Sequence, residues 1–470
     1  MQLWSAGRTA IFLVPTRGPG SPLPEGRWRL WLERHLPRFV AVLPCLAAAG
    51  GLQQAADGAA GRVATFTVLL AIACAVLAVA LYFAFMARRK FMFGGEPRPE
   101  RVRAPWSLHR QSRLLMGVLA LFAVAMLALA SAAPLTYAAW ITTPALIMVW
   151  AGAVAWLLAT LAWLASATRL PIIGALLLVA LGLSAANLSD NHRLRLASDL
   201  DGVVVAPDPV PPAAADGGRW PELVRDVDAW WRANGEPGVP PRIVLVAAEG
   251  GGIRAAYTTA LTLAPLHERC PSLSRHLLAV SGVSGGSVGA AVYTAALGAR
   301  PPPDAASCLD GLAELTPEIA GGGAAELADR ALRADLVEAV IIGLLHGDAL
   351  ARWWPREAFD RARTLEDALV HAWTGAGADP ARLRSGISRH WSPAAGVPAL
   401  LLNTTTVETG ARLVIANIGR RDPALVPTGR ACPTARPCLF ADLVPAAEPP
   451  LVSAAFASAW FSEYTSAAAS

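Results

Sequence analysis

The sequence predicts an α/β domain with a mainly parallel sheet, preceded by an all-α transmembrane region of four to five helices. Long uncharged runs fill much of the N-terminal part of the chain. The C-terminal part contains two segments in which an apolar, strand-like run meets glycines and then a helix-like run. Strands that alternate with helices in this way are typical of βαβ units and a parallel sheet.

The membrane prediction rests on composition and on uncharged runs. The 470 residues are 54% hydrophobic and 16% charged, with a mean hydropathy of +0.43, which is too apolar for an ordinary soluble protein. A helix needs about 20 apolar residues to cross the hydrocarbon core. The candidate spans are Val63–Ala87, Leu114–Ala133, Pro144–Ser166, the shorter Leu170–Ala186, and Phe39–Leu52, which contains Pro44.

Basic residues predict the orientation of these spans. Eight arginines and lysines lie within Arg88–Arg113, and a loop of this kind stays in the cytoplasm. The next loop, "PLTYAAWITT", is uncharged, and Arg169 again marks an inside turn. Three crossings after the basic loop place the chain beyond Asn187 outside, on the periplasmic side of a multi-pass membrane protein. Arg193 and Arg195 favour the opposite placement.

Composition divides the chain into four parts. Residues 1–62 form an N-terminal region with the possible first membrane helix, and residues 63–190 hold the transmembrane helices. Residues 191–218 form a linker, in which "APDPVPPAAADGG" is rich in proline, alanine and glycine and lacks apolar periodicity. Residues 219–470 have a globular composition and are long enough to bury a core.

A glycine triplet lies where a predicted strand becomes a predicted helix. Arg242–Ala248 is apolar and β-branched, which predicts a buried strand, and Ile253–Glu268 predicts a helix. The intervening glycines expose consecutive N–H groups at a positive helix end, suited to a phosphate or an oxyanion. No Gly-Lys-Ser/Thr follows, and Ala255 breaks a dinucleotide-binding pattern. An oxyanion remains as the ligand, unless the glycines form only a tight turn.

A second strand–glycine–helix segment carries a serine. His276–Val280 predicts a strand, Ser287–Leu297 predicts a helix, and "GVSGG" between them fits G-x-S-x-G with Ser284 at its centre. A serine on a sharp strand-to-helix turn between glycines is a nucleophile elbow. Because one βαβ unit separates the two motifs, they predict N–H donors beside a nucleophile, the geometry of an oxyanion hole.

Together these motifs resemble those of the patatin-like phospholipases, which combine a Gly-Gly-Gly-x-Arg/Lys oxyanion loop with a G-x-S-x-G elbow on an α/β/α sandwich. Three further segments look similar to that family: Asp360–Leu369, the strand pair within Leu400–Asn417, and Leu451–Phe461. The resemblance covers about Arg242–Ser470 and leaves the membrane region outside.

The resemblance implies a Ser–Asp dyad that hydrolyses an acyl ester, with a membrane glycerophospholipid or related lipid of the bilayer as substrate. The serine attacks the ester, the aspartate is the general base, and glycine-loop amides hold the oxyanion. The implied residues are the nucleophile Ser284, the oxyanion-hole residues Gly250, Gly251, Gly252 and Arg254, and the elbow glycines Gly282 and Gly286.

The dyad aspartate has no assigned position. The family places it in an Asp-Gly-Gly/Ala motif after the segment represented here by Leu451–Phe461, but the sequence then reads "SEYTSAAAS". Asp310 precedes a glycine too soon after the elbow, and Asp216 precedes two glycines within the linker. We therefore expect a truncated or frameshifted, nearly inactive form of a longer enzyme. If the chain is active, Asp216 is the acid to test.

Two other interpretations stay open. An α/β-hydrolase would need a late histidine, for which His346, His371 and His390 are available. A catalytically inactive, membrane-bound lipid-binding or scaffold protein would fit the missing aspartate.

The remaining features carry less weight. Leu336–Trp354 mixes apolar residues with paired tryptophans, which fits a lid, a membrane-dipping helix or a core helix. Cys432 and Cys438 could form a disulfide in an oxidising compartment, or be two small buried residues. No C-x-x-C zinc spacing occurs. We expect no metal, no cofactor and no nucleic-acid partner.

Overall fold

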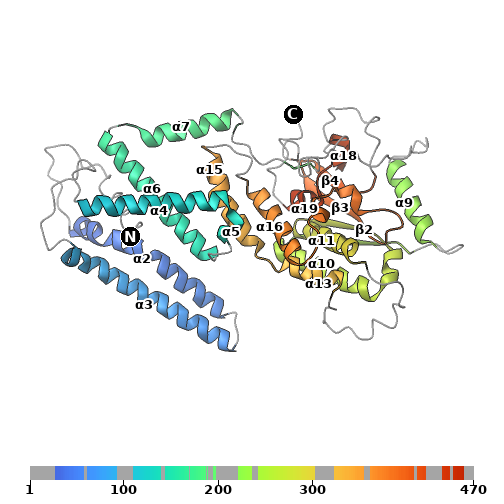
Figure 1. Cartoon of the computed structure of the whole chain (residues 1–470), viewed down its shortest axis with the longest axis horizontal. Helices are drawn as coiled ribbons and strands as arrows, with labels where there is room; N and C mark the ends of the chain where they lie inside the picture. Colours follow the sequence, from blue (N-terminus) through green and yellow to red (C-terminus); the bar gives the residue numbers. More distant parts are fainter. Residues whose placement is uncertain are drawn as a thin grey trace. The chain divides into compact units, whose positions relative to one another are not determined.

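The computed structural model forms two compact units (Figure 1). The first comprises Met1–Ser189 and Ile341–Phe359, and the second comprises Asp190–Val340 and Asp360–Ser470. The residues that the structure describes are 27–57, 61–92, 110–138, 143–168, 170–186, 188, 194–196, 221–235, 242–301, 322–353, 360–406, 410–419, 437–444 and 448–459.

Helices make up the described part of the first unit. They are α2 (Arg27–Asp57), α3 (Gly61–Met92), α4 (Arg110–Ala132), α5 (Pro134–Ala138), α6 (Thr143–Thr168) and α7 (Ile172–Ala185). Each predicted span therefore lies in a helix or extends one or two residues beyond it, and α2 continues through Pro44. Within the described residues, one stretch, Ala64–Phe83 in α3, is long and apolar enough to cross a membrane. Leu121–Ala132, Ala145–Leu158 and Ile172–Ala185 are shorter apolar stretches.

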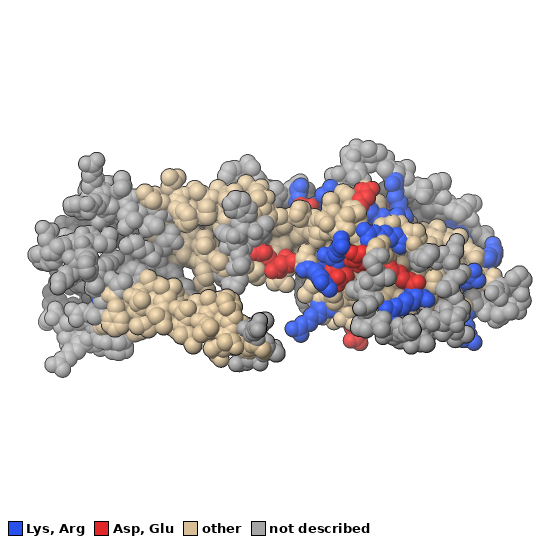
Figure 2. All heavy atoms as spheres, turned by 60° about the horizontal axis from the view of Figure 1, so that its bottom comes forward, with Lys and Arg blue, Asp and Glu red and all other residues tan. Residues whose placement is uncertain are grey.

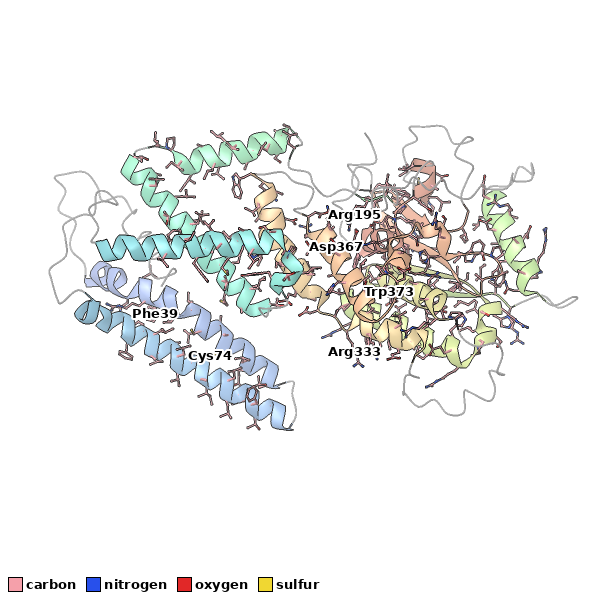
Figure 3. The ribbon with its side chains drawn as sticks, viewed as in Figure 1. Phe39, Cys74, Arg195, Arg333, Asp367 and Trp373 are labelled. Carbon is pink, nitrogen blue, oxygen red and sulfur yellow. The ribbon has the colours of Figure 1, made fainter. Side chains whose placement is uncertain are left out.

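The helices of the first unit expose apolar side chains. Phe66, Leu121 and Leu178 are 68%, 72% and 70% exposed, and the charged side chains that the structure describes and Figure 2 colours lie mainly over the second unit. The α2–α3 pair is held partly by aromatic contacts, since the rings of Phe39 (Figure 3) and Tyr82 lie 5.4 Å apart. Exposed apolar surface on this scale is expected where lipid or another apolar partner covers a helix.

A segment from the second half of the sequence belongs to the first unit. The segment begins at Ile341, near the end of α14 (Leu336–Ile342), and continues through a π-helical turn (Gly343–Asp348) and α15 (Ala349–Ala351). Ile342 packs with Tyr137 and Leu146, and the Trp353 indole donates to the Leu176 carbonyl at 3.3 Å. The second half of the predicted lid or membrane-dipping segment therefore packs among the helices.

The second unit is built on a mixed five-stranded sheet in the order β1-β2-β3-β4-β5. The strands are β1 (Val244–Ala248), β2 (Leu277–Val283), β3 (Ala399–Thr405), β4 (Arg412–Ala416) and β5 (Cys438–Leu439). The β3–β4 pair is antiparallel and the other three pairs are parallel. The prediction of a mainly parallel sheet is confirmed, and Leu400–Asn417 forms the expected strand pair.

Helices pack on both faces of this sheet, most of them on one. That face carries the main core, formed with α10 (Gly252–Arg269), α11 (Gly285–Ala299), α13 (Ala324–Leu332), α16 (Arg361–Gly375) and α19 (Leu451–Ala459). On the opposite face, Trp230 of α9 (Pro221–Asn234) packs against Leu278 and Ala399. Short helices complete the unit: η2 (Pro271–Arg275), α17 (Ala381–Arg384), η4 (Ile387–His390) and α18 (Phe440–Leu443).

One expectation for the sheet is wrong. The first strand was expected to be buried, yet β1 pairs with β2 alone among the described strands and lies at the sheet edge. Leu245 is 66% exposed. An edge strand has a neighbouring strand on one side only. The apolar composition of a strand does not reveal whether it lies at the edge or in the middle of the sheet.

Candidate active site

Ser284 lies at the turn between β2 and α11, in a strained backbone conformation. Its φ of 54° and ψ of −126° make it the N-cap of α11. Among the described residues it is the one non-glycine residue with positive φ. A non-glycine residue in such a conformation costs about 1–3 kcal/mol, and such strain clusters at active sites. The geometry is that of the predicted nucleophile elbow.

The elbow glycines let α11 approach the backbone of neighbouring segments. A Cβ built on Gly286 would lie 2.4 Å from the carbonyl oxygen of Ala248, and one on Gly285 would lie 1.9 Å from that of Gly252. A Cβ on Gly282 would lie 2.7 Å from the backbone of Ser287. Both predicted elbow glycines, Gly282 and Gly286, are therefore sterically required.

The glycine loop lies beside the serine, as predicted. A Cβ built on Gly250 would be 3.2 Å from the Cβ of Ser284 and 3.8 Å from its Oγ. Gly252 has a φ of 61° and begins α10, with Gly251 as its N-cap. Within the described part of the chain, no backbone acceptor takes the N–H of Gly250 or Gly251. These amides are free to bind an oxyanion close to Ser284.

Arg254 is placed less specifically than the glycines. It is exposed in the first turn of α10. No hydrogen bond or ion pair of its side chain is found among the described residues. Its predicted membership of the oxyanion hole stays a prediction.

The C-terminal end of α19 is hydrogen-bonded to the elbow. The Ser284 N–H donates to the carbonyl oxygen and the hydroxyl of Ser458, each at 3.2 Å. The Ser458 hydroxyl also lies 2.7 Å from that of Ser287, and it donates to the Asn403 carbonyl at 2.5 Å. Ser458 was missed from the sequence because a serine in an alanine-rich helix has no motif around it.

A second polar group stabilises the end of β2. The Asn403 amide donates to the Ser281 hydroxyl at 3.0 Å and to the Gly282 carbonyl at 2.9 Å. Its own oxygen accepts from the Arg412 guanidinium at 2.9 Å. Because β4 runs antiparallel to β3, Arg412 at the start of β4 lies at the same end of the strands as Ser284, which follows β2. The elbow is thus held from β3, β4 and α19.

No general base is found among the described residues. No described hydrogen bond reaches the Ser284 hydroxyl from an acid or a histidine. His346 belongs to the first unit, and His371 is exposed on α16. His390 is paired with Ser385 at 3.0 Å. Asp216 and Asp310 lie outside the described residues.

His390 also lies far from the nucleophile. It lines a cavity together with Ala299 and Arg300, at the opposite end of α11 from Ser284. Helix α11 has 15 residues and is therefore about 22 Å long. A Ser–His pair built on His390 has no support in this geometry.

Comparison of the chain with protein-family models, with curated proteins and with solved structures found no match.

Proposed function

We propose that this protein is a membrane-anchored lipid acyl hydrolase of patatin type, with Ser284 as its nucleophile. The observation that carries this proposal is the strained Ser284 backbone at the strand-to-helix turn. Gly250 lies beside Ser284, and the amides of Gly250 and Gly251 have no backbone acceptor among the described residues. A tight turn alone would need neither the strain at a serine nor exposed amides beside its hydroxyl.

In the proposed reaction the Ser284 oxygen attacks the ester carbonyl carbon. The carbonyl oxygen becomes an oxyanion, which the amides of Gly250 and Gly251 stabilise. Collapse of this intermediate breaks the ester bond, and the serine proton passes through a general base to the leaving alcohol. Water then hydrolyses the acyl-enzyme, releasing a carboxylic acid and restoring Ser284. The resemblance assigns the base to an aspartate.

The proposed substrate is a glycerophospholipid or related acyl ester of the bilayer. Its support is the apolar helical unit, with one membrane-length helix and three shorter apolar stretches, which would hold the site near lipid. We further propose that the chain crosses the membrane several times, with the second unit outside. Cys270 and Cys438 each take part in a disulfide, which supports an oxidising compartment. Cys432 and most of the basic loop lie outside the described residues.

The location of the second unit can be tested at an exposed position. Ser392 is exposed, so Ser392→Cys should react with an impermeant maleimide in cells whose outer membrane alone is permeabilised. Labelling that requires lysis of the inner membrane would contradict the outside placement.

The catalytic proposal is tested by incubating the purified full chain with phospholipid vesicles and measuring released fatty acid by mass spectrometry. We expect release that Ser284→Ala abolishes. Ser392→Ala, an exposed serine remote from any motif, is the matched control and should retain the wild-type rate. Release that persists in Ser284→Ala would refute Ser284 as the nucleophile.

A second candidate is a catalytically inactive lipid-binding or scaffold protein. It is favoured by the Ser284 hydroxyl, which has no acid or histidine partner within the described part of the chain. Without a base, the hydroxyl stays protonated and is a weak nucleophile. This candidate predicts vesicle binding, equal for wild type and Ser284→Ala, without fatty acid release from either.

A further inference from the structure

A cavity of about 460 Å³ lies in the second unit, at the end of α11 opposite to Ser284. Ala299 and Arg300 line it from the end of that helix, and the rest of its wall comes from Gly377 to His390. The length of α11 separates the cavity from the elbow by about 20 Å. The cavity is therefore distinct from the candidate active site, and its volume is within the range of ligand pockets.

The lining of the cavity is strongly basic. Three arginines line it, Arg300, Arg382 and Arg389, against one acidic lining residue, Asp379. Arg300 is held in place, because its guanidinium donates to the carbonyl of Gly323 at 3.3 Å. The Asp379 carboxylate accepts the N–H of Ala381 at 2.9 Å. The arginines thus exceed the acid by two charges, without a described ion pair that neutralises Arg382 or Arg389.

Two buried polar groups of the lining have unused hydrogen-bonding atoms. The Nε of Arg382 and the Nδ1 of His390 are buried without a partner among the described residues. His390 is only 4% exposed. A buried polar atom without a partner costs about 1–3 kcal/mol, and a fold that retains two of them at one cavity points to a ligand there.

The position of Arg382 is built into the fold by a glycine. A Cβ built on Gly298 would lie 1.3 Å from Nη2 of Arg382, so the guanidinium occupies the space that any other residue would fill. Burial lowers the pKa of Arg382. Burial, followed by the charge of Arg382, lowers the pKa of His390 to about 3, against a smaller opposite effect of the Arg382 carbonyl. An anion bound in the cavity would raise both pKa values again, because it stabilises the charged forms of Arg382 and His390.

We infer that this cavity binds a phosphate group, either free in solution or in the headgroup of an anionic lipid. Arginine matches phosphate because its planar fork donates two parallel hydrogen bonds to phosphate oxygens. Arg382 and Arg389 offer such donors, Arg300 adds charge, and the unused Nδ1 of His390 accepts from a protonated phosphate oxygen. The inference is independent of the acyl hydrolase proposal, since it uses no residue near Ser284.

The test measures phosphate binding by the full chain in phosphatidylcholine nanodiscs, by titration calorimetry with inorganic phosphate. We expect saturable binding that Arg382→Gln weakens at least tenfold and that Arg389→Gln, at an exposed position, also weakens. Arg384→Gln is the matched control, because Arg384 lies on the same short helix α17 and does not line the cavity. It should change the affinity less than twofold.

A second variant and a second ligand source complete the test. Gly298→Ala displaces the Arg382 guanidinium and should weaken binding without removing a charge. Nanodiscs containing phosphatidic acid should raise the unfolding temperature in wild type but not in Arg382→Gln if the source is a lipid headgroup; a response to free phosphate alone assigns a soluble ligand. Absence of both responses, or equal weakening by Arg384→Gln, would overturn the inference.

Discussion

Replacing Gly250 by alanine should impair the proposed catalysis while leaving the fold largely intact. The new Cβ would lie 3.2 Å from the Cβ of Ser284 and 3.8 Å from its hydroxyl oxygen. Gly250 does not have positive φ and is exposed, so alanine introduces no backbone strain and no buried overpacking. The effect should therefore fall on the nucleophile and on the space in front of it.

The contact distance sets the size of this effect. An ordinary carbon–carbon contact is about 3.5–4.0 Å, so Ser284 or the loop has to move by a few tenths of an ångström. A misplacement of about 1 Å can lower a rate by about 10²-fold, so we expect about a tenfold fall in kcat/KM. The free energy of unfolding should change by less than about 1 kcal/mol, because the loop is at the surface.

The assay compares ester hydrolysis and denaturant unfolding of Gly250→Ala with those of wild type. Gly375→Ala at the end of α16 is the matched control, since a Cβ there meets no atom within 4 Å, and it should leave both measurements unchanged. A Gly250→Ala protein that hydrolyses ester at the wild-type rate would refute the placement of the glycine loop at the reacting carbonyl.

Further predictions concern stability. Gly286→Ala places a Cβ 2.4 Å from the Ala248 carbonyl oxygen, and should cost at least about 3 kcal/mol of unfolding free energy; an unchanged denaturant midpoint would contradict this. Tyr293→Phe removes a buried 2.8 Å hydrogen bond to His267 and should cost about 1–3 kcal/mol, measured in the same way. Burial lowers the pKa of His267 to about 4, so the unfolded chain binds the proton more tightly; stability should fall as the pH falls from about 6.5 towards 4, and His267→Gln should flatten this slope. Burial raises the pKa of Glu366 to about 7, against the opposing effects of Arg195 and Ser453, so the folded chain holds the proton more tightly; stability should fall as the pH rises from about 4.3 to 7, and a slope that Glu366→Gln leaves unchanged would refute this assignment.

Glu366 also holds Arg195, in the segment 194–196, against helix α16. Its carboxylate forms an ion pair with Arg195 and accepts a hydrogen bond of 2.8 Å from the Ser453 hydroxyl. Arg195 also lies 3.9 Å from Asp367, beside it in Figure 3. This network joins residues far apart in the sequence.

The elements that carry the candidate site could be predicted because their signals are local. The expected helix Ile253–Glu268 is α10, and the expected strand and helix around Ser284 are β2 and α11. Apolar runs, glycines and the G-x-S-x-G spacing each lie within a few residues of the element that they predict. The proximity of Gly250 to Ser284 followed from the order of strands in a βαβ unit.

Features that depend on contacts between distant segments could not be predicted. The exposure of Leu245 depends on the position of β1 at the sheet edge and on what packs against its face. The support that Ser458 gives to Ser284 joins residues 174 positions apart. The cavity at which Arg382 Nε and His390 Nδ1 are buried without a partner among the described residues depends on the packing of α17 against α11. The grouping of Ile341–Phe359 with the helical unit is likewise a property of tertiary packing.

The most direct test of the account is covalent capture of Ser284 by a long-chain fluorophosphonate, whose phosphoryl oxygen occupies an oxyanion hole. The full chain in nanodiscs would be treated with the reagent, digested and mapped by mass spectrometry. The account predicts one adduct on Ser284, absent in Ser284→Ala and formed more slowly in Gly250→Ala. No adduct, or an adduct on another serine that persists in Ser284→Ala, would contradict the claim that Ser284 and the glycine loop form an acyl-transfer site.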